Sequence, residues 1–290
     1  NKESIELQRR LFHQRALPDL ADNIKCGNSL IGPEFYQGKQ LDLFDEDERL
    51  RINVFDWQSE FSQIMQPGGF DAVIGNPPYI RIQAMKEWAP VEVEFYKKCY
   101  SAASQGNYDI YVVFVERGVS LLNAAGRLGF ILPHKFFNAE YGGPIREMLS
   151  RGRHLAHIVH FGAQQVFPRA TTYTCLLFLD KSGRRQCDFV SVPDLAAWIQ
   201  TGAGVRGDIV AEKINGVVWN FTVGESAYLV ERLKGMPAKL GDLADIFVGL
   251  QTSADDVFIM DFVSQTSRTL RLRSRSLDAE VTLERELFHP

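Results

Sequence analysis

The sequence has 290 residues, of which 45% are hydrophobic and 23% charged, and its formal net charge is −4. This balance predicts one large globular domain with part of a second, and the absence of an apolar run of about eighteen residues excludes a membrane-spanning helix. The negative charge provides no global attraction for nucleic acid. DNA binding would therefore depend on local patches, such as the arginines at positions 268, 271, 273 and 275.

Cysteine usage and the chain ends indicate where the protein works. The sequence contains four cysteines without CxxC spacing, Cys26, Cys99, Cys175 and Cys187, and three of them lie within or beside apolar runs. We expect reduced, packed cysteines, which are typical of an intracellular protein. The chain begins with Asn1 and carries no signal-peptide pattern, so we expect a part of a longer protein in the cytoplasm of a bacterium or archaeon.

The first third of the chain alternates helical, acidic and strand-like stretches. Residues 1–18 predict the end of a helix, and residues 23–31 contain a short strand-like piece. Residues 33–66 are mixed and acidic, which favours a solvated insertion on the surface. The apolar run from Phe70 to Ile74 predicts a buried strand that Gly75 and two prolines end.

The middle of the chain continues the alternation. Residues 81–106 predict a partly helical connection. After it, the sequence predicts a helix that Gly126 ends, a buried strand, a short helix and two further strands, at residues 108–123, 128–132, 145–149, 155–161 and 173–179. Strand, helix and strand in this order predict an α/β fold with a mostly parallel sheet. The last two strands are close in sequence and predict an antiparallel hairpin at the edge of the sheet.

Composition changes after Lys181-Ser182-Gly183 and again near Leu240. We therefore predict a catalytic domain over residues 1–183, a connecting region of short strands and glycine-rich turns over residues 184–239, and the start of a second domain over residues 240–290.

The segment Asn76-Pro77-Pro78-Tyr79 directly follows the strand that ends at Ile74 and Gly75. Ligands of open α/β sheets lie at the carboxyl ends of strands, so this segment is a candidate catalytic loop. The prolines stiffen the backbone and leave carbonyls without N–H donors, and Asn76 adds a side-chain acceptor. Two rigid acceptors beside an aromatic ring suit an amino group on a flat heterocycle.

Such an amine is a weak nucleophile because its lone pair is delocalised into the ring. Two acceptors that hold its hydrogens draw the nitrogen toward a tetrahedral shape, so that it can attack an electrophilic methyl group. Acceptors on a stiff loop are preorganised for that transition state. A plain turn after a strand is the alternative interpretation, but the full string after an apolar strand favours function.

Five segments, in one order along the chain, resemble motifs III, IV, V, VI and VIII of the DNA amino-methyltransferases that depend on S-adenosylmethionine, in particular the TaqI-like adenine enzymes and the type IIG restriction-modification methylases. They are Asn23–Leu30, Phe70–Tyr79, Tyr108–Glu116, Gly126–Pro133, and residues 161–168 with 172–179. The resemblance implies a Rossmann-like methyltransferase fold, S-adenosyl-L-methionine as cofactor, and methylation of adenine in double-stranded DNA.

The resemblance also implies roles for individual residues. Asn76 and the carbonyl of Pro77 would grip the adenine amine, Tyr79 would stack on the flipped base, and Phe167 would contact its other side or edge. Asn28, with Ser29, would lie near the adenosyl end of the cofactor, where the family usually has Asp. The glycine-rich motif I, which binds the methionine end of the cofactor, is absent from residues 1–28.

Two alternatives remain at this point. A protein glutamine methyltransferase uses the same loop, although about 110 residues follow Leu179 here, and a non-catalytic DNA-recognition fragment is the other rival. His154, His157 and His160 have the spacing of metal ligands on a helix, but the segment is predicted as a helix end followed by a strand, in which such neighbours point to opposite faces. We therefore expect no metal. Residues 240–260, with Val248–Thr252 and Asp255–Phe258, resemble the opening of the family's target-recognition domain.

Overall fold

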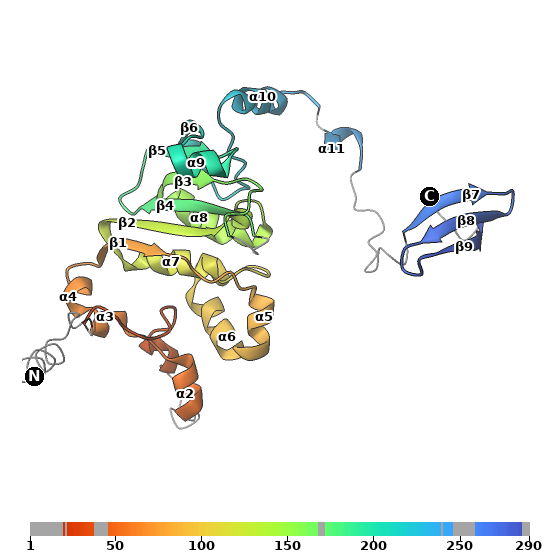
Figure 1. Cartoon of the computed structure of the whole chain (residues 1–290). Coiled ribbons are helices and arrows are strands. Elements are labelled where there is room, and N and C mark those ends of the chain that lie inside the picture. Colours follow the sequence, from red (N-terminus) through yellow and green to blue (C-terminus); the bar gives the residue numbers. More distant parts are fainter. Residues whose placement is uncertain are drawn as a thin grey trace, which may run out of the picture. The chain divides into compact units, whose positions relative to one another are not determined.

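The computed structural model describes residues 20, 22–37, 46–167, 172–238, 240–245 and 259–285. The chain forms two compact units, residues 1–232 and 233–290 (Figure 1). We predicted a boundary at residue 183, but the first unit continues past it because β5 (Gln186–Ser191) and β6 (Val205–Val210) join the main sheet. The predicted helix end at residues 1–18 lies outside the described residues.

The main sheet has six strands in the order β1-β2-β4-β3-β5-β6. Its first four strands along the chain are β1 (Phe70–Gly75), β2 (Leu122–Pro133), β3 (Leu155–His160) and β4 (Thr174–Asp180). β1 pairs parallel with β2, and β3 pairs parallel with β5. β4 is antiparallel to both of its neighbours, β2 and β3, and β6 is antiparallel to β5. Four strands therefore run in one direction, which confirms the predicted α/β fold.

The predicted hairpin of β3 and β4 is present, but its place in the sheet was predicted wrongly. β4 lies between β2 and β3 rather than at an edge. Its alternate residues Cys175, Leu177 and Leu179 point to one face of the sheet and are buried in the main core. Because β4 runs against its neighbours, its first residue lies at the edge where β2 and β3 end.

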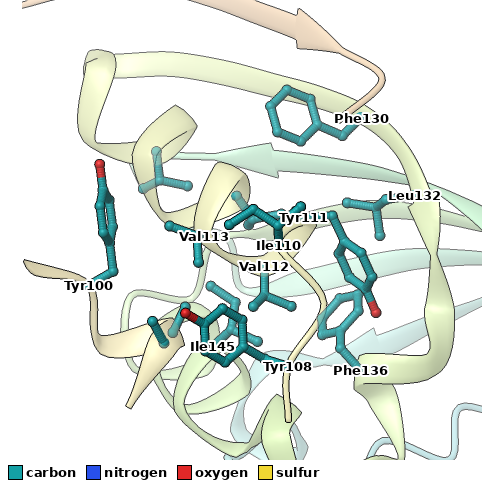
Figure 2. Packing of buried hydrophobic residues seen from close by; sticks show 14 of the residues in the cluster. Tyr100, Tyr108, Ile110, Tyr111, Val112, Val113, Phe130, Leu132, Phe136 and Ile145 are labelled. Atoms are coloured by element: carbon teal, nitrogen blue, oxygen red, sulfur yellow. The ribbon is translucent and has the colours of Figure 1, made fainter. Parts of the chain in front are cut away.

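The connection from β1 to β2 is helical, as a parallel pair requires a long crossover. It contains α5 (Ile82–Trp88), α6 (Pro90–Cys99), the short η3 (Ser101–Ala103) and α7 (Tyr111–Leu121). α7 packs against β1 and β2. Its buried residues, among them Tyr111, Val112 and Val113, meet Phe130 and Leu132 of β2 in the core shown in Figure 2.

Two local predictions in this region were wrong. Gly126 was expected to end α7, but the helix already ends at Leu121 and Gly126 lies inside β2. A Cβ atom on Gly126 would lie 2.7 Å from the carbonyl oxygen of Phe70, so the glycine permits the close pairing of the two strands. Residues 23–31 contain only an isolated bridge, from Asn28 to Val54, rather than a strand.

The stretch 33–66 is not simply a surface insertion. Its described residues form η1 (Pro33–Tyr36), α2 (Glu46–Ile52), α3 (Trp57–Glu60) and α4 (Ser62–Met65). Phe35, Ile52 and Phe55 are buried, and the first two belong to the main core. Glu46 and Asp47 at the start of α2 are exposed as expected, but one side of the segment packs inward.

The remaining elements of the first unit follow β2. They are η4 (His134–Phe137), η5 (Glu140–Gly142), α8 (Gly143–Arg151), α9 (Leu195–Thr201), η6 (Ala211–Lys213) and α10 (Glu225–Lys234), the last of which reaches the division between the units. The four cysteines are free; Cys175 and Cys187 are buried as expected, whereas Cys26 and Cys99 are exposed.

The second unit contains α11 (Leu240–Leu243) and a separate antiparallel sheet of β7 (Met260–Gln265), β8 (Thr269–Ser274) and β9 (Ala279–Glu284). The segments Val248–Thr252 and Asp255–Phe258, on which the resemblance to a target-recognition domain depends, lie outside the described residues. Within the described part of the chain, no helix has both the length and the apolar character needed to cross a membrane.

Candidate active site at the carboxyl end of β1

The segment Asn76-Pro77-Pro78-Tyr79 leaves the carboxyl end of β1, as predicted. Asn76 and Pro78 are exposed, while Pro77 is buried and anchors the loop. Gly75, the last residue of the strand, faces the ring of Phe130, whose Cε1 atom would lie 2.9 Å from a Cβ atom there. Any larger residue would push the strand end away from β2, so this glycine sets the position from which the loop departs.

Two contacts fix the side chain of Tyr79, one through its hydroxyl and one through its ring. Its hydroxyl donates a hydrogen bond to the carbonyl oxygen of Ile131 in β2, at 3.1 Å. Its ring meets the ring of Tyr111 edge to face, with centroids 6.4 Å apart. Burial, and secondarily Cys175, raises the pKa of Tyr79 to about 12, so the phenol remains protonated and keeps this donor at neutral pH.

The backbone after the loop is joined to the segment that begins α7. The N–H of Ile82 donates to the carbonyl of Tyr108, and the N–H of Ile110 donates to the carbonyl of Ile80, each at 2.9 Å. Both ends of the loop are therefore fixed by regular structure, β1 on one side and this pair of bonds on the other. Such a loop presents its acceptors with little conformational freedom to lose.

A cavity of about 220 Å³ adjoins the loop. It is lined by the loop residues Asn76, Pro77 and Pro78, by β1 and α7, and by Ser29, Trp57 and Phe130. The carbonyl oxygen of Ser29 accepts hydrogen bonds from Nε1 of Trp57 at 3.0 Å and from Nε of Arg117 at 3.1 Å. The structure thus brings Ser29 and the Asn-Pro-Pro segment together in one site.

Asn28 and Phe167 are not among the described residues that line this cavity. The Oδ1 atom of Asn28 accepts a hydrogen bond from the N–H of Leu30 at 3.1 Å, and a side-chain hydrogen bond links Asn28 to Tyr96. Phe167 is half-buried in the connection between β3 and β4. Since β3 ends and β4 begins at the edge that holds Asn76, this connection belongs to the same edge of the sheet.

Sequence reasoning missed three residues of the cavity, Trp57, Phe114 and Arg117. Trp57 lies in the stretch interpreted as a surface insertion. Phe114 and Arg117 are three residues apart on α7 and therefore share one side of the helix, and this spacing was the signal in the sequence that could have found them.

The three histidines suspected as metal ligands have separate contacts. His154 contacts the carbonyl of Asp180, His157 pairs with Asp188 at 2.7 Å, and His160 accepts from a backbone N–H. Among the described residues, no group of three or more histidine, cysteine or acidic side chains is placed to hold a metal ion.

The arginine cluster near the chain end is largely neutralised within its own sheet. Arg271 pairs with Glu280 at 2.7 Å, Arg273 with Asp278 at 3.0 Å, and Arg275 with Asp261 at 2.9 Å. These exposed pairs reduce the positive charge that the sequence alone attributes to the patch.

Comparisons with known proteins identify relatives of this chain among restriction-modification methyltransferases. Residues 2–167, more than half of the chain, match the family model described as "Eco57I restriction-modification methylase". The chain is 31% identical, over 94% of its length, to the type II restriction enzyme and methyltransferase RM.Eco57I of Escherichia coli, and 29% identical, over 72% of its length, to the type II methyltransferase M.PaeR7I of Pseudomonas aeruginosa. It spans 26% and 38% of those two relatives.

Among solved structures, the DrdV–DNA complex aligns with 72% of this chain and 24% of its own, at 16% identity and a TM-score of 0.45. The type IIG restriction endonuclease BpuSI aligns with 65% of this chain and 26% of its own, at 16% identity and a TM-score of 0.40. On the strength of the family match, the chain belongs to the Eco57I restriction-modification methylase family.

Proposed function

We propose that the protein transfers a methyl group from S-adenosylmethionine to the exocyclic amine of adenine in double-stranded DNA, as part of a restriction-modification or phage-defence system. The observation that carries the proposal is the rigid acceptor loop Asn76-Pro77-Pro78, fixed at the carboxyl end of β1 beside the ring of Tyr79. The family membership of the chain supports the same chemistry.

In this proposal, the side-chain oxygen of Asn76 and the carbonyl of Pro77 accept the two hydrogens of the adenine amine. Held in this way, the nitrogen lone pair would attack the methyl group as its carbon–sulfur bond breaks to leave a neutral thioether, and a proton would leave the amine for solvent after the transfer. The base has to leave the duplex to reach the loop, which costs a few kcal/mol or so. Stacking on Tyr79, with Phe167 at the other side or edge, offsets this cost at about 1–3 kcal/mol per aromatic contact.

The cavity beside the loop fits the flat adenosyl part of the cofactor. Trp57 and Phe114 supply aromatic walls, while Ser29 and Arg117 supply polar groups at its rim. Pockets for such ligands are mainly apolar, with a few polar groups that fix orientation. Ser29 lies at the adenosyl end in this assignment, and Asn28, the residue before it, stands outside the lining of the cavity. When bound, S-adenosylmethionine supplies an electrophilic methyl group on a sulfonium.

The DNA partner follows from the substrate and from the relatives. RM.Eco57I is named as both a restriction enzyme and a methyltransferase. An enzyme that modifies chromosomal DNA works in the cytoplasm of a bacterium or archaeon, and we place this protein there. We assign target recognition to the region from residue 240 to residue 290.

The test replaces Asn76 by alanine in the full-length protein. Because Asn76 is exposed, the substitution removes a polar acceptor without disturbing the core. Loss of one preorganised polar group costs about 100-fold to 1000-fold in rate. The matched control is Asn220→Ala, the same change at an exposed position between the core residue Trp219 and the half-buried Phe221.

Methyl transfer is measured with isotopically labelled S-adenosylmethionine on DNA duplexes, and the modified base is identified by mass spectrometry. We expect N6-methyladenine from the wild type and from Asn220→Ala, and almost none from Asn76→Ala at unchanged melting temperature. Methylation of cytosine, methylation of a protein glutamine instead of DNA, or full turnover by a folded Asn76→Ala variant would each refute the proposal.

A further inference from the structure

Two histidines meet where β2 and β3 end. His134 directly follows β2, and His160 is the last residue of β3. Their ring centroids are 4.1 Å apart. The ring of Tyr173, just before β4, lies nearly parallel to that of His134 at 6.5 Å, and Phe189 lies 5.9 Å from His160. This histidine pair (His134 and His160) therefore lies at the edge of the sheet that carries the catalytic loop.

Both imidazoles bind the same backbone residue, Gly162. The N–H of Gly162 donates to Nδ1 of His160 at 3.1 Å, and the carbonyl of Gly162 lies 3.2 Å from Nε2 of His134. Gly162 has a φ of +58°, a left-handed conformation that glycine adopts without strain. Both backbone polar groups of Gly162, in the first turn after β3, are thus hydrogen-bonded to side chains.

The chemistry of these bonds determines the protonation of the pair. A carbonyl oxygen only accepts, so Nε2 of His134 carries the hydrogen. An N–H only donates, so Nδ1 of His160 carries a lone pair, and His160 is neutral in this arrangement. Burial, together with the neighbouring His134, lowers the pKa of His160 to about 4, which agrees with this role at neutral pH.

A third side chain holds the same connection two residues further on. Nε2 of Gln164 donates to the carbonyl of Val192 at 2.5 Å, and its Oε1 accepts from the N–H of Leu195 at 2.6 Å. Val192 directly follows β5, and Leu195 is the first residue of α9. Val166 packs against the small apolar cluster that contains Phe161 and Val192.

We infer that His134, His160 and Gln164 are positioning residues that hold residues 162–167 ready for the extruded adenine, with Phe167 at the end of the held segment. The inference rests on the proposed function. Holding the segment in advance means that its conformational entropy is lost on folding rather than on base extrusion, which makes extrusion more favourable.

The decisive comparison is between His160→Leu and His160→Asn in the full-length protein. Leucine retains bulk but no acceptor, whereas asparagine places an amide oxygen at the position of Nδ1 along the side chain. The matched control is His157→Leu on the same strand, whose ring pairs with Asp188 instead. Three quantities are measured: methyl transfer, fluorescence of 2-aminopurine at the target base, and hydrogen exchange of the amides in residues 162–167.

For His160→Leu we expect faster amide exchange in residues 162–167, weaker 2-aminopurine fluorescence, and a turnover loss of about fivefold to tenfold, the effect of one lost hydrogen bond. His160→Asn restores most of each signal, and His157→Leu resembles the wild type. If His160→Leu does not fold, Gln164→Met carries the same expectation, because it removes the side-chain hydrogen bonds of Gln164 while preserving length.

Unchanged exchange and extrusion in folded His160→Leu would overturn the inference, as would a His160→Asn variant that is as impaired as His160→Leu. A wild-type protein that methylates no DNA would refute the proposed function, and this inference with it. Normal wild-type transfer with an unaffected His160→Leu variant would refute the inference alone.

Discussion

Replacing Tyr79 by phenylalanine and by alanine separates the role of its ring from that of its hydroxyl. The hydroxyl donates to the carbonyl of Ile131 at 3.1 Å from a half-buried position. A neutral hydrogen bond of this kind contributes about 0.5–1.5 kcal/mol net, and water can reach a half-buried carbonyl. We therefore expect Tyr79→Phe to lower the unfolding free energy by about 0.5–1 kcal/mol.

The ring is expected to matter more for function. Stacking of a base on an aromatic side chain contributes about 1–3 kcal/mol, which corresponds to about fivefold to 150-fold in base extrusion and in kcat/KM. Tyr79→Phe keeps this surface and its edge-to-face contact with Tyr111, so kcat/KM falls less than about fivefold. Tyr79→Ala loses both the stacking surface and the contact with Tyr111, so its kcat/KM falls by the whole factor of about fivefold to 150-fold.

The assay combines kcat/KM on a duplex with one target site, 2-aminopurine fluorescence at that site, and melting temperature. The pKa of Tyr79, raised to about 12, also predicts that Tyr79→Phe leaves the pH–rate profile unchanged over the neutral range. If phenylalanine impairs transfer as severely as alanine, the hydroxyl and not the ring carries the function, and the stacking argument is wrong. If alanine leaves transfer intact, Tyr79 lies outside the site.

Two further predictions concern charge. The pKa of His160 falls from 6.5 to about 4 on folding. Its neutral form therefore contributes stability that is complete above about pH 6.5 and is lost as the pH falls toward 4. The shift corresponds to at most about 3 kcal/mol of unfolding free energy, which we reduce to about 2 kcal/mol because the ring is partly exposed. Urea unfolding across this pH range should show that loss in the wild type but not in His160→Asn, and parallel curves for the two proteins would contradict it. Arg273→Gln breaks an exposed pair with Asp278 at 3.0 Å, so we expect the unfolding free energy to change by less than about 1 kcal/mol. We also expect the slope of log DNA affinity against log salt concentration to change by less than about one. A larger change in that slope would show that Arg273 contacts phosphate.

The position of the candidate loop Asn76–Tyr79 after a strand could be predicted because its signals are local. An apolar run followed by Gly75 and two prolines indicates a strand that stops abruptly, whatever the rest of the chain does. The position of Gly126 could not be predicted in the same way. A glycine after a helical pattern usually ends a helix, but Gly126 is required by contact with Phe70, which is far away in sequence.

The buried part of residues 33–66 failed for a related reason. The exposed acidic start of α2 dominates the composition of that stretch, whereas Phe35 and Ile52 pack in the main core. Arg51 of α2 pairs with the buried carboxylate of Glu92 in α6. The sequence pattern shows that the segment is acidic, but it does not show that a partner about forty residues later anchors it.

The histidines show how topology decides which neighbours meet. Along the sequence, His160 is grouped with His154 and His157, and this spacing suggested a metal site. In the sheet, β4 is inserted between β2 and β3, and the ends of these two strands lie at one edge. That arrangement joins His160 to His134 instead. Because β4 also begins at this edge, the connection from β3 to β4 starts and ends beside the catalytic loop, so the strand order itself brings Phe167 to the edge where a base would bind.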